Sequence, residues 1–307
     1  MKHRFQILMW LRHRSWLSEA AAVLRARPAV AAAGALLLAV SLAAQTPAVM
    51  SGSNAAAGGV AADTTWRLAV VDGLVEAPAP GAAAVASTVA ASAAAAKAEV
   101  ALAALGQDVA RISRESALRT AFQAYFSYRA AMPAGVRKPY LYFVDLGLDN
   151  GTARGWVFDM ESLALVEGPF TVAHGRGSGP RNGTPQRFSN AAGSYASALG
   201  LYLAQETYTF MGKSGGRRYA SVGLRLRGES GDFNGAARAR GIVAHGAPYV
   251  TRREAGRSEG CPAMEPARAN RLLPMIANGG VVFIYSPNDP RWLAGDPWIQ
   301  ASPPIAG

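Results

Sequence analysis

The spacing of hydrophobic residues changes near residue 116, and this change predicts where the folded part of the chain begins. Leu118, Phe122, Tyr125 and Phe126 recur at i, i+4, i+7 and i+8, which places them on one face of a helix. Pro133-Ala134-Gly135 is expected to end that helix, because proline cannot continue it.

Beyond this helix the pattern becomes typical of strands. Residues 140–146 and 155–160 are rich in aromatic and β-branched side chains, and Asp149-Asn150-Gly151 between them is a strong hairpin-turn signal. Further strands are predicted at 163–173, 199–210, 220–226, 241–244 and 281–285, and a short helix at 266–277. Residues 116–300 are therefore expected to form one mostly β domain with flanking helices.

The segment before this domain, residues 46–115, differs in composition. It is dominated by Ala, Gly, Ser and Pro, is interrupted at 77–81, and has no repeat of fixed length. Such a segment has little apolar surface to bury, so we expect a spacer in which residues 91–105 are free to become helical.

Residues 1–45 have the composition of an export signal. Six basic residues stand against the single acid Glu19, and an apolar run follows at 29–44. The run is shorter than the roughly 20 residues that comfortably span a bilayer, and small residues follow at its end. A cleaved signal peptide and a retained signal-anchor therefore both remain open.

The charge of the chain narrows the class of partner. The formal net charge is +11, and about half of it belongs to the leader, so the remainder is mildly basic. This balance favours an anionic partner such as a wall polymer or lipid head groups. No run of Lys and Arg with interleaved aromatic residues indicates a nucleic-acid surface, so no nucleic-acid partner is expected.

Cys261 is the only cysteine in the chain, and a lone thiol in an exported protein is prone to oxidation unless it has a use. His174 and His245 are the only histidines outside the leader, and each precedes a glycine at the end of a predicted strand. Because an imidazole is the usual means of activating a thiol at neutral pH, Cys261 and His245 form a candidate nucleophile and base. A buried structural cysteine with two hydrogen-bonded histidines is the alternative.

Glycines next to these residues suit the same chemistry. Gly260 allows the backbone to turn so that the N–H groups of Glu259, Gly260 and Cys261 point at a developing oxyanion. Gly246 is expected to accept a hydrogen bond from His245 through its carbonyl and so fix the tautomer. Two histidines without an HExxH or CxxC pattern do not predict a zinc site.

These residues also carry a resemblance to a known family. The stretches 241–247 (GIVAHGA) and 256–263 (GRSEGCPA) resemble the active-site block of the murein L,D-transpeptidase (YkuD-like) superfamily, in particular the branch in which Pro-Ala follows the cysteine. Four more segments agree in order, at 172–179, 188–190, 197–200 and 224–234, and the resemblance covers roughly residues 117–287.

The resemblance implies a β-sandwich-like catalytic fold and cysteine acyl transfer on peptidoglycan stem peptides through a thioester, with no cofactor or metal. It implies that His245 is the base and Gly246 its orienting group. Ser258 is then a supporting hydrogen-bonding group, and the backbone at 259–261 supplies the oxyanion donors. It places the protein in the periplasm, released or anchored to the inner membrane. A catalytically silent wall-binding module and an L,D-carboxypeptidase that uses the same residues are the alternatives.

Glu259 departs from the commoner family pattern, which has histidine at this position. An acid beside the thiol tends to raise its pKa, which puts the acyl acceptor and full transpeptidase competence in question. Arg257 and Arg225 are candidates to bind substrate carboxylates through paired N–H groups. His174 is a candidate to line the same cleft and bind substrate, or else to hydrogen-bond a strand end.

Overall fold

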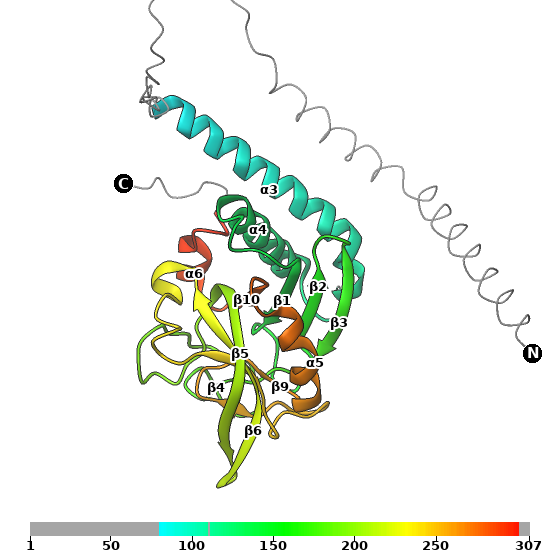
Figure 1. The fold of residues 1–307 in the computed structure, drawn as a ribbon, viewed down its shortest axis with the longest axis vertical. Helices are drawn as coiled ribbons and strands as arrows, with labels where there is room; N and C mark the ends of the chain where they lie inside the picture. Colours follow the sequence, from blue (N-terminus) through cyan, green and yellow to red (C-terminus); the bar gives the residue numbers. More distant parts are fainter. Residues whose placement is uncertain (1–79, 110, 301–307) are drawn as a thin grey trace, which may run out of the picture. The chain divides into compact units, whose positions relative to one another are not determined.

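The structure is a computed structural model that describes residues 80–109 and 111–300. The expected leader at 1–45 and half of the expected spacer lie outside the described residues. Elements are labelled as in Figure 1.

An eight-stranded sheet forms the centre of the domain, with strand order β3-β2-β1-β10-β5-β6-β7-β9. The pairs β1–β10 and β7–β9 are parallel, and the other neighbours are antiparallel. A separate two-stranded parallel sheet pairs β4 with β8. The strands are β1 Tyr140–Asp145, β2 Gly155–Asp159, β3 Ala164–Phe170, β4 His174–Gly175, β5 Gly200–Ser214, β6 Arg217–Gly228, β7 Val243–Gly246, β8 Arg257–Ser258, β9 Ala263–Met264 and β10 Val281–Tyr285.

Helices cover the sheet on both faces near β1. They are α3 Pro80–Val109, α4 Glu115–Ala131, α5 Pro266–Ile276 and α6 Pro290–Gly295, with a short 3-10 turn, η1, at Gly231–Phe233. Phe122 of α4 packs edge-on against Phe158 with ring centroids 5.5 Å apart. On the other face Tyr142 stacks on Phe170, and Arg268 of α5 lies over the same ring. Because both faces are covered, β1 and β10 consist almost entirely of buried residues.

The predicted elements are confirmed in type and position. The helix expected after residue 116 is α4, the hairpin around Asp149-Asn150-Gly151 joins β1 to β2, and the short helix at 266–277 is α5. The predicted mostly β fold with flanking helices is likewise the observed one.

Part of the segment expected to be a spacer belongs to the folded unit. Helix α3 packs along α4 and contacts β3, and an ion pair of 2.7 Å joins Glu99 to Arg119 between the two helices. One side of α3 is buried, formed by Ala94, Ala98, Ala101, Leu102, Leu105 and Val109. The expectation that this stretch has little to bury was wrong, because small alanine side chains let the two helices approach closely and bury the larger residues between them.

Helix α3 also contains the one segment of the described residues, Thr88–Val109, that is long and apolar enough to cross a membrane by length and composition. Burial of its stripe against α4 gives the same apolar residues a partner within the domain.

The β5–β6 hairpin is longer than the strands beside it. Strand β10 pairs with β5 only at residues 200–203, and β7 pairs with β6 only at 223–225. The remaining length of the two strands is paired with each other alone, and Figure 1 shows it extending beyond the rest of the sheet. This extension lies next to the cleft described below.

Candidate active site

Three short strands bring the candidate nucleophile and base to the same cleft. His245 lies on β7, and Cys261 lies in the turn that joins β8 to β9. Strand β9 pairs with β7 in parallel, with Ala263 opposite His245, so the turn that carries the thiol lies beside the imidazole-bearing strand. The cleft has a volume of about 750 Å³, and both side chains line it together with Arg257, Ser258 and Glu259.

The imidazole of His245 is held from two sides. Its Nδ1 atom lies 3.0 Å from the carbonyl oxygen of Gly246, as expected from the sequence. A carbonyl can only accept, so Nδ1 carries the proton of the neutral ring and Nε2 is the basic nitrogen. Phe210, on the extended part of β5, stacks on the ring with centroids 4.0 Å apart and an angle of 21°. Burial lowers the pKa of His245 to about 4, although the Gly246 carbonyl favours the charged form.

The thiol of Cys261 is also neutral at rest. Burial raises its pKa to about 11, and the acid Glu259 acts in the same direction. The backbone of Val243 and the charge of Arg240 lower it. A neutral thiol and a neutral imidazole that line one cleft suit general-base catalysis, in which the thiolate forms only as the base takes its proton.

The turn before the thiol requires glycine at residue 260. Its φ of +123° is rarely adopted by other residues, and a Cβ would lie 2.8 Å from Ile242 Cδ1 and 2.9 Å from the carbonyl oxygen of Ala196. Within the turn, Ser258 Oγ donates to the carbonyl of Cys261 at 2.7 Å and accepts from the Gly260 N–H at 3.2 Å. Ser258 thus links the two ends of this turn, and the Gly260 N–H is already engaged.

The structure places His174 away from the cleft. Its side chain is fully buried and is not among the residues that line the cleft. Its Nδ1 atom lies 2.9 Å from the guanidinium of Arg154, which is itself fully buried. Burial and the charge of Arg154 lower the pKa of His174 to about 4. The sequence left substrate binding and a hydrogen bond at a strand end open for His174, and the contact observed is with the side chain of Arg154.

The two arginines expected to bind substrate differ in position. Arg257 lines the cleft and donates to the carbonyl of Gly179 at 3.2 Å. Arg225 does not line it; its guanidinium pairs with Glu206 at 3.0 Å and lies over the ring of Tyr208. Leu224 and Leu226, on either side of it, are buried, so Arg225 lies on the outward face of β6, at a different part of the surface.

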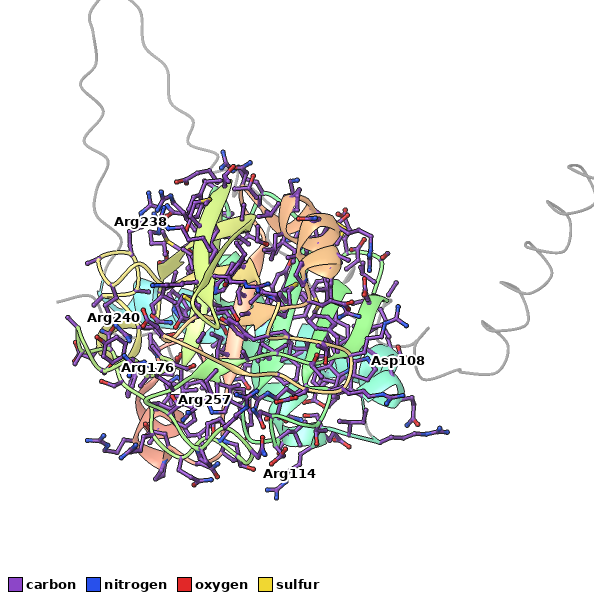
Figure 2. All side chains as sticks on the ribbon, turned by 90° about the horizontal axis from the view of Figure 1, so that it is seen from below. Asp108, Arg114, Arg176, Arg238, Arg240 and Arg257 are labelled. Atoms are coloured by element: carbon purple, nitrogen blue, oxygen red, sulfur yellow. The ribbon has the colours of Figure 1, made fainter. Side chains whose placement is uncertain are left out.

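Sequence reasoning missed several residues of the cleft. Arg176, Lys213 and Arg240 line it and add positive charge, and Tyr195, Tyr219 and Tyr249 add aromatic surface. Figure 2 shows Arg176, Arg240 and Arg257 on the same side of the molecule. Glu259 is the only acid that lines the cleft among the described residues. No motif surrounds Arg240 in the sequence, so nothing there marked it as part of a site.

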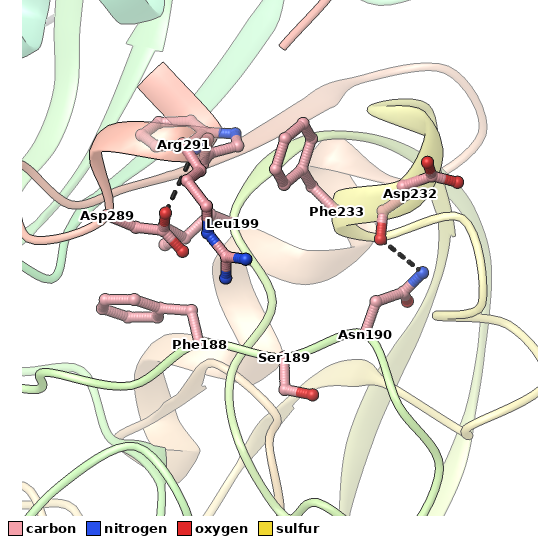
Figure 3. Close-up of a pocket in the computed structure, with 9 residues that line it drawn as sticks. Phe188, Ser189, Asn190, Leu199, Asp232, Phe233, Asp289 and Arg291 are labelled. Atoms are coloured by element: carbon pink, nitrogen blue, oxygen red, sulfur yellow. Dashed lines mark hydrogen bonds between the residues drawn. The ribbon is translucent and has the colours of Figure 1, made fainter. Parts of the chain in front are cut away.

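A second cavity of about 430 Å³ contains neither Cys261 nor His245. Figure 3 shows Phe188, Asp289 and Arg291 on one side of it and Phe233 with Asp232 on the other. Among the described residues, no group of three or more His, Cys, Asp and Glu side chains is placed to hold a metal ion.

Comparison with known proteins connects the chain to one family. A family model described as "L,D-transpeptidase catalytic domain" matches residues 110–285, more than half of the chain. A comparison with curated proteins found no match.

Several solved structures are similar at low identity. An L,D-transpeptidase from Mycobacterium smegmatis is 12% identical, with a TM-score of 0.30 over 48% of this chain and 58% of that one. An L,D-transpeptidase (Yku) from Stackebrandtia nassauensis is 15% identical, with a TM-score of 0.32 over 60% and 76%. The chain spans between 49% and 59% of the length of the first three of these structures.

Proposed function

The chain belongs to the L,D-transpeptidase catalytic domain family, and from this premise we propose that it is a cysteine acyltransferase acting on peptidoglycan stem peptides. The observation that carries the proposal is the pair Cys261 and His245, which line one cleft, with Nδ1 of His245 fixed by the carbonyl of Gly246. That contact leaves Nε2 as the basic nitrogen of the candidate general base.

In the proposed reaction Nε2 of His245 accepts the thiol proton, and Sγ of Cys261 attacks the carbonyl of the third residue of a stem peptide. The bond to the terminal D-residue breaks, and its amine leaves with the proton from the imidazolium. The resulting thioester is attacked by an amine, which forms a new amide and restores the thiol. Attack by water instead gives an L,D-carboxypeptidase.

The oxyanion of each tetrahedral intermediate needs donors close to the thiol. The Gly260 N–H already donates to Ser258 Oγ, so we assign this role to the N–H groups of Glu259 and Cys261. Gly260 then serves to shape the turn, and Ser258 to hold it.

The charge of the cleft supports an anionic substrate. Arg176, Lys213, Arg240 and Arg257 line it against the single acid Glu259. Carboxylates of a stem peptide pair well with guanidinium groups. Arg257 is the leading candidate for this contact because it lies in the same cleft as the thiol, four residues before it.

Such a substrate lies outside the cytoplasm. We therefore propose that the chain is exported through its basic and apolar leader and acts in the periplasm, released or tethered to the inner membrane.

A wall-binding module without turnover is the second candidate. It is favoured by one observation, the raised pKa of Cys261, to which the acid Glu259 contributes. The two candidates share a cleft and differ in whether a covalent bond to sulfur forms.

The deciding experiment incubates the full chain and its Cys261→Ala variant with a disaccharide tetrapeptide and follows intact protein and products by mass spectrometry. We expect a thioester adduct on the wild type alone, with release of the terminal D-residue. Cross-linked dimers then indicate transpeptidation, and tripeptide alone indicates hydrolysis. Equal binding by both proteins with neither adduct nor product would reject the enzyme and favour the binding module.

A further inference from the structure

Arg240 is the cleft residue with the most extensive fixed contacts to backbone. Its Nη1 donates to the carbonyl of Ser189 at 2.7 Å. Its Nη2 donates to the carbonyl of Ala196 at 2.8 Å and to Ser194 Oγ at 3.1 Å. One guanidinium thus spans the segment 189–196, which forms a wall of the cleft at residues 192, 193 and 195.

All of these partners are neutral, so they satisfy the donors of Arg240 and leave its charge in place. None of the ion pairs found among the described residues includes Arg240. Arg238, two residues earlier, provides the contrast, because it pairs with Glu206 at 3.3 Å on the exposed surface. Arg240 is half-buried, and water and salt screen its charge less than they screen an exposed one.

The same arginine reaches the catalytic turn through two short connections. Gly241, the next residue, has its carbonyl oxygen 4.0 Å from Sγ of Cys261. Ala196, whose carbonyl accepts from Arg240, lies against Gly260: a Cβ on Gly260 would be 2.9 Å from that same oxygen. Arg240 is therefore connected to the catalytic turn through its hydrogen bond to Ala196 and through its chain neighbour Gly241.

Other charged groups around the thiol are more exposed or act in the opposite direction. The remaining cations of the cleft are Arg176, Lys213 and Arg257, all of them exposed, and its acid is Glu259. The other titratable side chains that line it are His245, Tyr195, Tyr219 and Tyr249. Tyr202 and Tyr208 also interact with a charge on the thiol. Arg240 is thus the cleft cation whose burial leaves it least screened.

We propose that Arg240 is a positioning residue that anchors the 189–196 wall of the cleft and supplies the fixed positive charge that favours the thiolate of Cys261. As a part of acyl transfer this inference rests on the proposed function. The effect on the thiol itself does not, because thiolate formation is measurable without any peptide substrate.

The test uses the single cysteine of the chain, so that alkylation has one site. The full chain is treated with iodoacetamide at several pH values from 7 to 9.5, and the rate at Cys261 is followed by intact mass. This range lies below the thiol pKa of about 11, so the rate follows the fraction of thiolate. We expect Arg240→Gln to slow alkylation by about tenfold across the range, equivalent to a pKa higher by about one unit.

Matched variants distinguish the effect of the Arg240 charge on the thiol from the effect of its hydrogen bonds on the cleft wall. Arg240→Lys keeps the charge and loses the three-way clamp, and we expect its rate to stay within about threefold of wild type, since a fixed charge is the larger influence on a thiolate. Arg238→Gln removes an exposed arginine outside the cleft and should leave the rate unchanged. Glu259→Gln should speed alkylation.

Two outcomes would overturn the inference. An equal loss in Arg240→Lys and Arg240→Gln would assign Arg240 to the wall alone, and an unchanged or faster rate in Arg240→Gln would remove the charge effect. If Arg240→Gln unfolds at too low a temperature to assay, the alkylation rate of Arg240→Lys is used instead. A tenfold lower rate in Arg240→Lys, which keeps the positive charge, would contradict the proposed effect of that charge. Failure of the proposed function appears separately, as the absence of a thioester from the tetrapeptide in wild type.

Discussion

The guanidinium of Arg154 lies 2.9 Å from Nδ1 of His174, in a part of the domain where both side chains are fully buried. Arg154 also donates to the carbonyl of Val172 from Nε and Nη2, at 3.0 and 2.8 Å, and to Leu148 from Nη1 at 2.7 Å. A donor that cannot lose its proton fixes the neutral tautomer of His174 with Nδ1 as the acceptor. His245 has the opposite tautomer, because its Nδ1 faces the Gly246 carbonyl.

Substitution of His174 should therefore affect mainly stability, and substitution of His245 mainly turnover. His174→Leu removes an acceptor from a buried guanidinium, so we expect a loss of about 1–3 kcal/mol in the free energy of unfolding, measured by urea titration. Its turnover per folded molecule should stay within a few-fold of wild type. His245→Leu should lose turnover by about a hundredfold or more with a small change in stability. A reversed pattern would make His174 the base.

The sequence predicted His245 as the base and left His174 between substrate binding and a hydrogen bond at a strand end, although both stand in Ala-His-Gly. The local sequence is alike around the two histidines. The difference between them arises from a distant contact, because Arg154, which directly precedes β2, lies against His174. Pairing of β4 with β8 places His174 opposite Arg257, and pairing of β7 with β9 places His245 opposite Ala263, but only His245 lines the cleft. Long-range register of this kind is invisible in a single sequence.

The elements were predictable where their pattern was strong. β10 was expected at 281–285 and is observed there, because a run of five β-branched and aromatic residues is typical of a buried strand. The burial of α3 was not predictable in this way. Its alanines do not alternate with polar residues at helical spacing, and its packing depends on the apolar face of α4. Arg240 belongs to the same class, because its role depends on three contacts from a segment more than forty residues away.

Stability should fall as the solution becomes mildly acidic. His174 and His245 each have a pKa lowered from 6.5 to about 4 by burial, so between these values the unfolded chain binds protons that the native state does not. The stability present above pH 6.5 is lost as the pH falls toward 4, and by pH 5 each histidine should account for about 2 kcal/mol.

Urea titrations at pH 7.5, 6 and 5 measure this slope. Burial raises the pKa of Asp145 and Asp296, which opposes the loss as the pH falls, so the slope of each histidine variant is compared with that of the wild type. The variants His174→Leu and His245→Leu should each remove about half of the loss. An unchanged slope in both would mean that neither imidazole is kept neutral by the fold.

The ring of Phe210 should keep the pKa of His245 low and hold the imidazole in its orientation. Because Phe210 stacks on His245 at 4.0 Å and is itself half-buried, Phe210→Ala admits water to the imidazole. We expect the pKa of His245 to rise from about 4 toward 6.5. Turnover should fall by about tenfold, since the imidazole is also less well oriented. NMR titration of the histidine resonances gives the pKa, with His174 as an internal reference that should not move.

Two controls sharpen that result. Phe210→Trp keeps an aromatic face against the imidazole and should preserve most of the activity. Thr209→Ala changes the preceding residue, which is exposed and does not line the cleft, and should leave both the pKa of His245 and turnover unchanged. If Phe210→Ala titrates like wild type, burial of His245 has another source.

Helix α3 should be required for the stability of the domain. Its buried stripe covers α4, so a fragment that begins at residue 111 exposes apolar surface that a fragment beginning at residue 80 keeps covered. We expect the shorter fragment to unfold at a markedly lower temperature or to aggregate.

Within the full chain, Leu105→Ala should lower the free energy of unfolding by about 2–5 kcal/mol because the Leu105 side chain is 1% exposed. Val89→Ala, at a position 56% exposed, should be nearly neutral. If the two fragments melt at equal temperatures and Leu105→Ala is neutral, α3 does not stabilise the domain. It would then be part of the spacer, as the sequence predicted, and its apolar residues would be available to another partner.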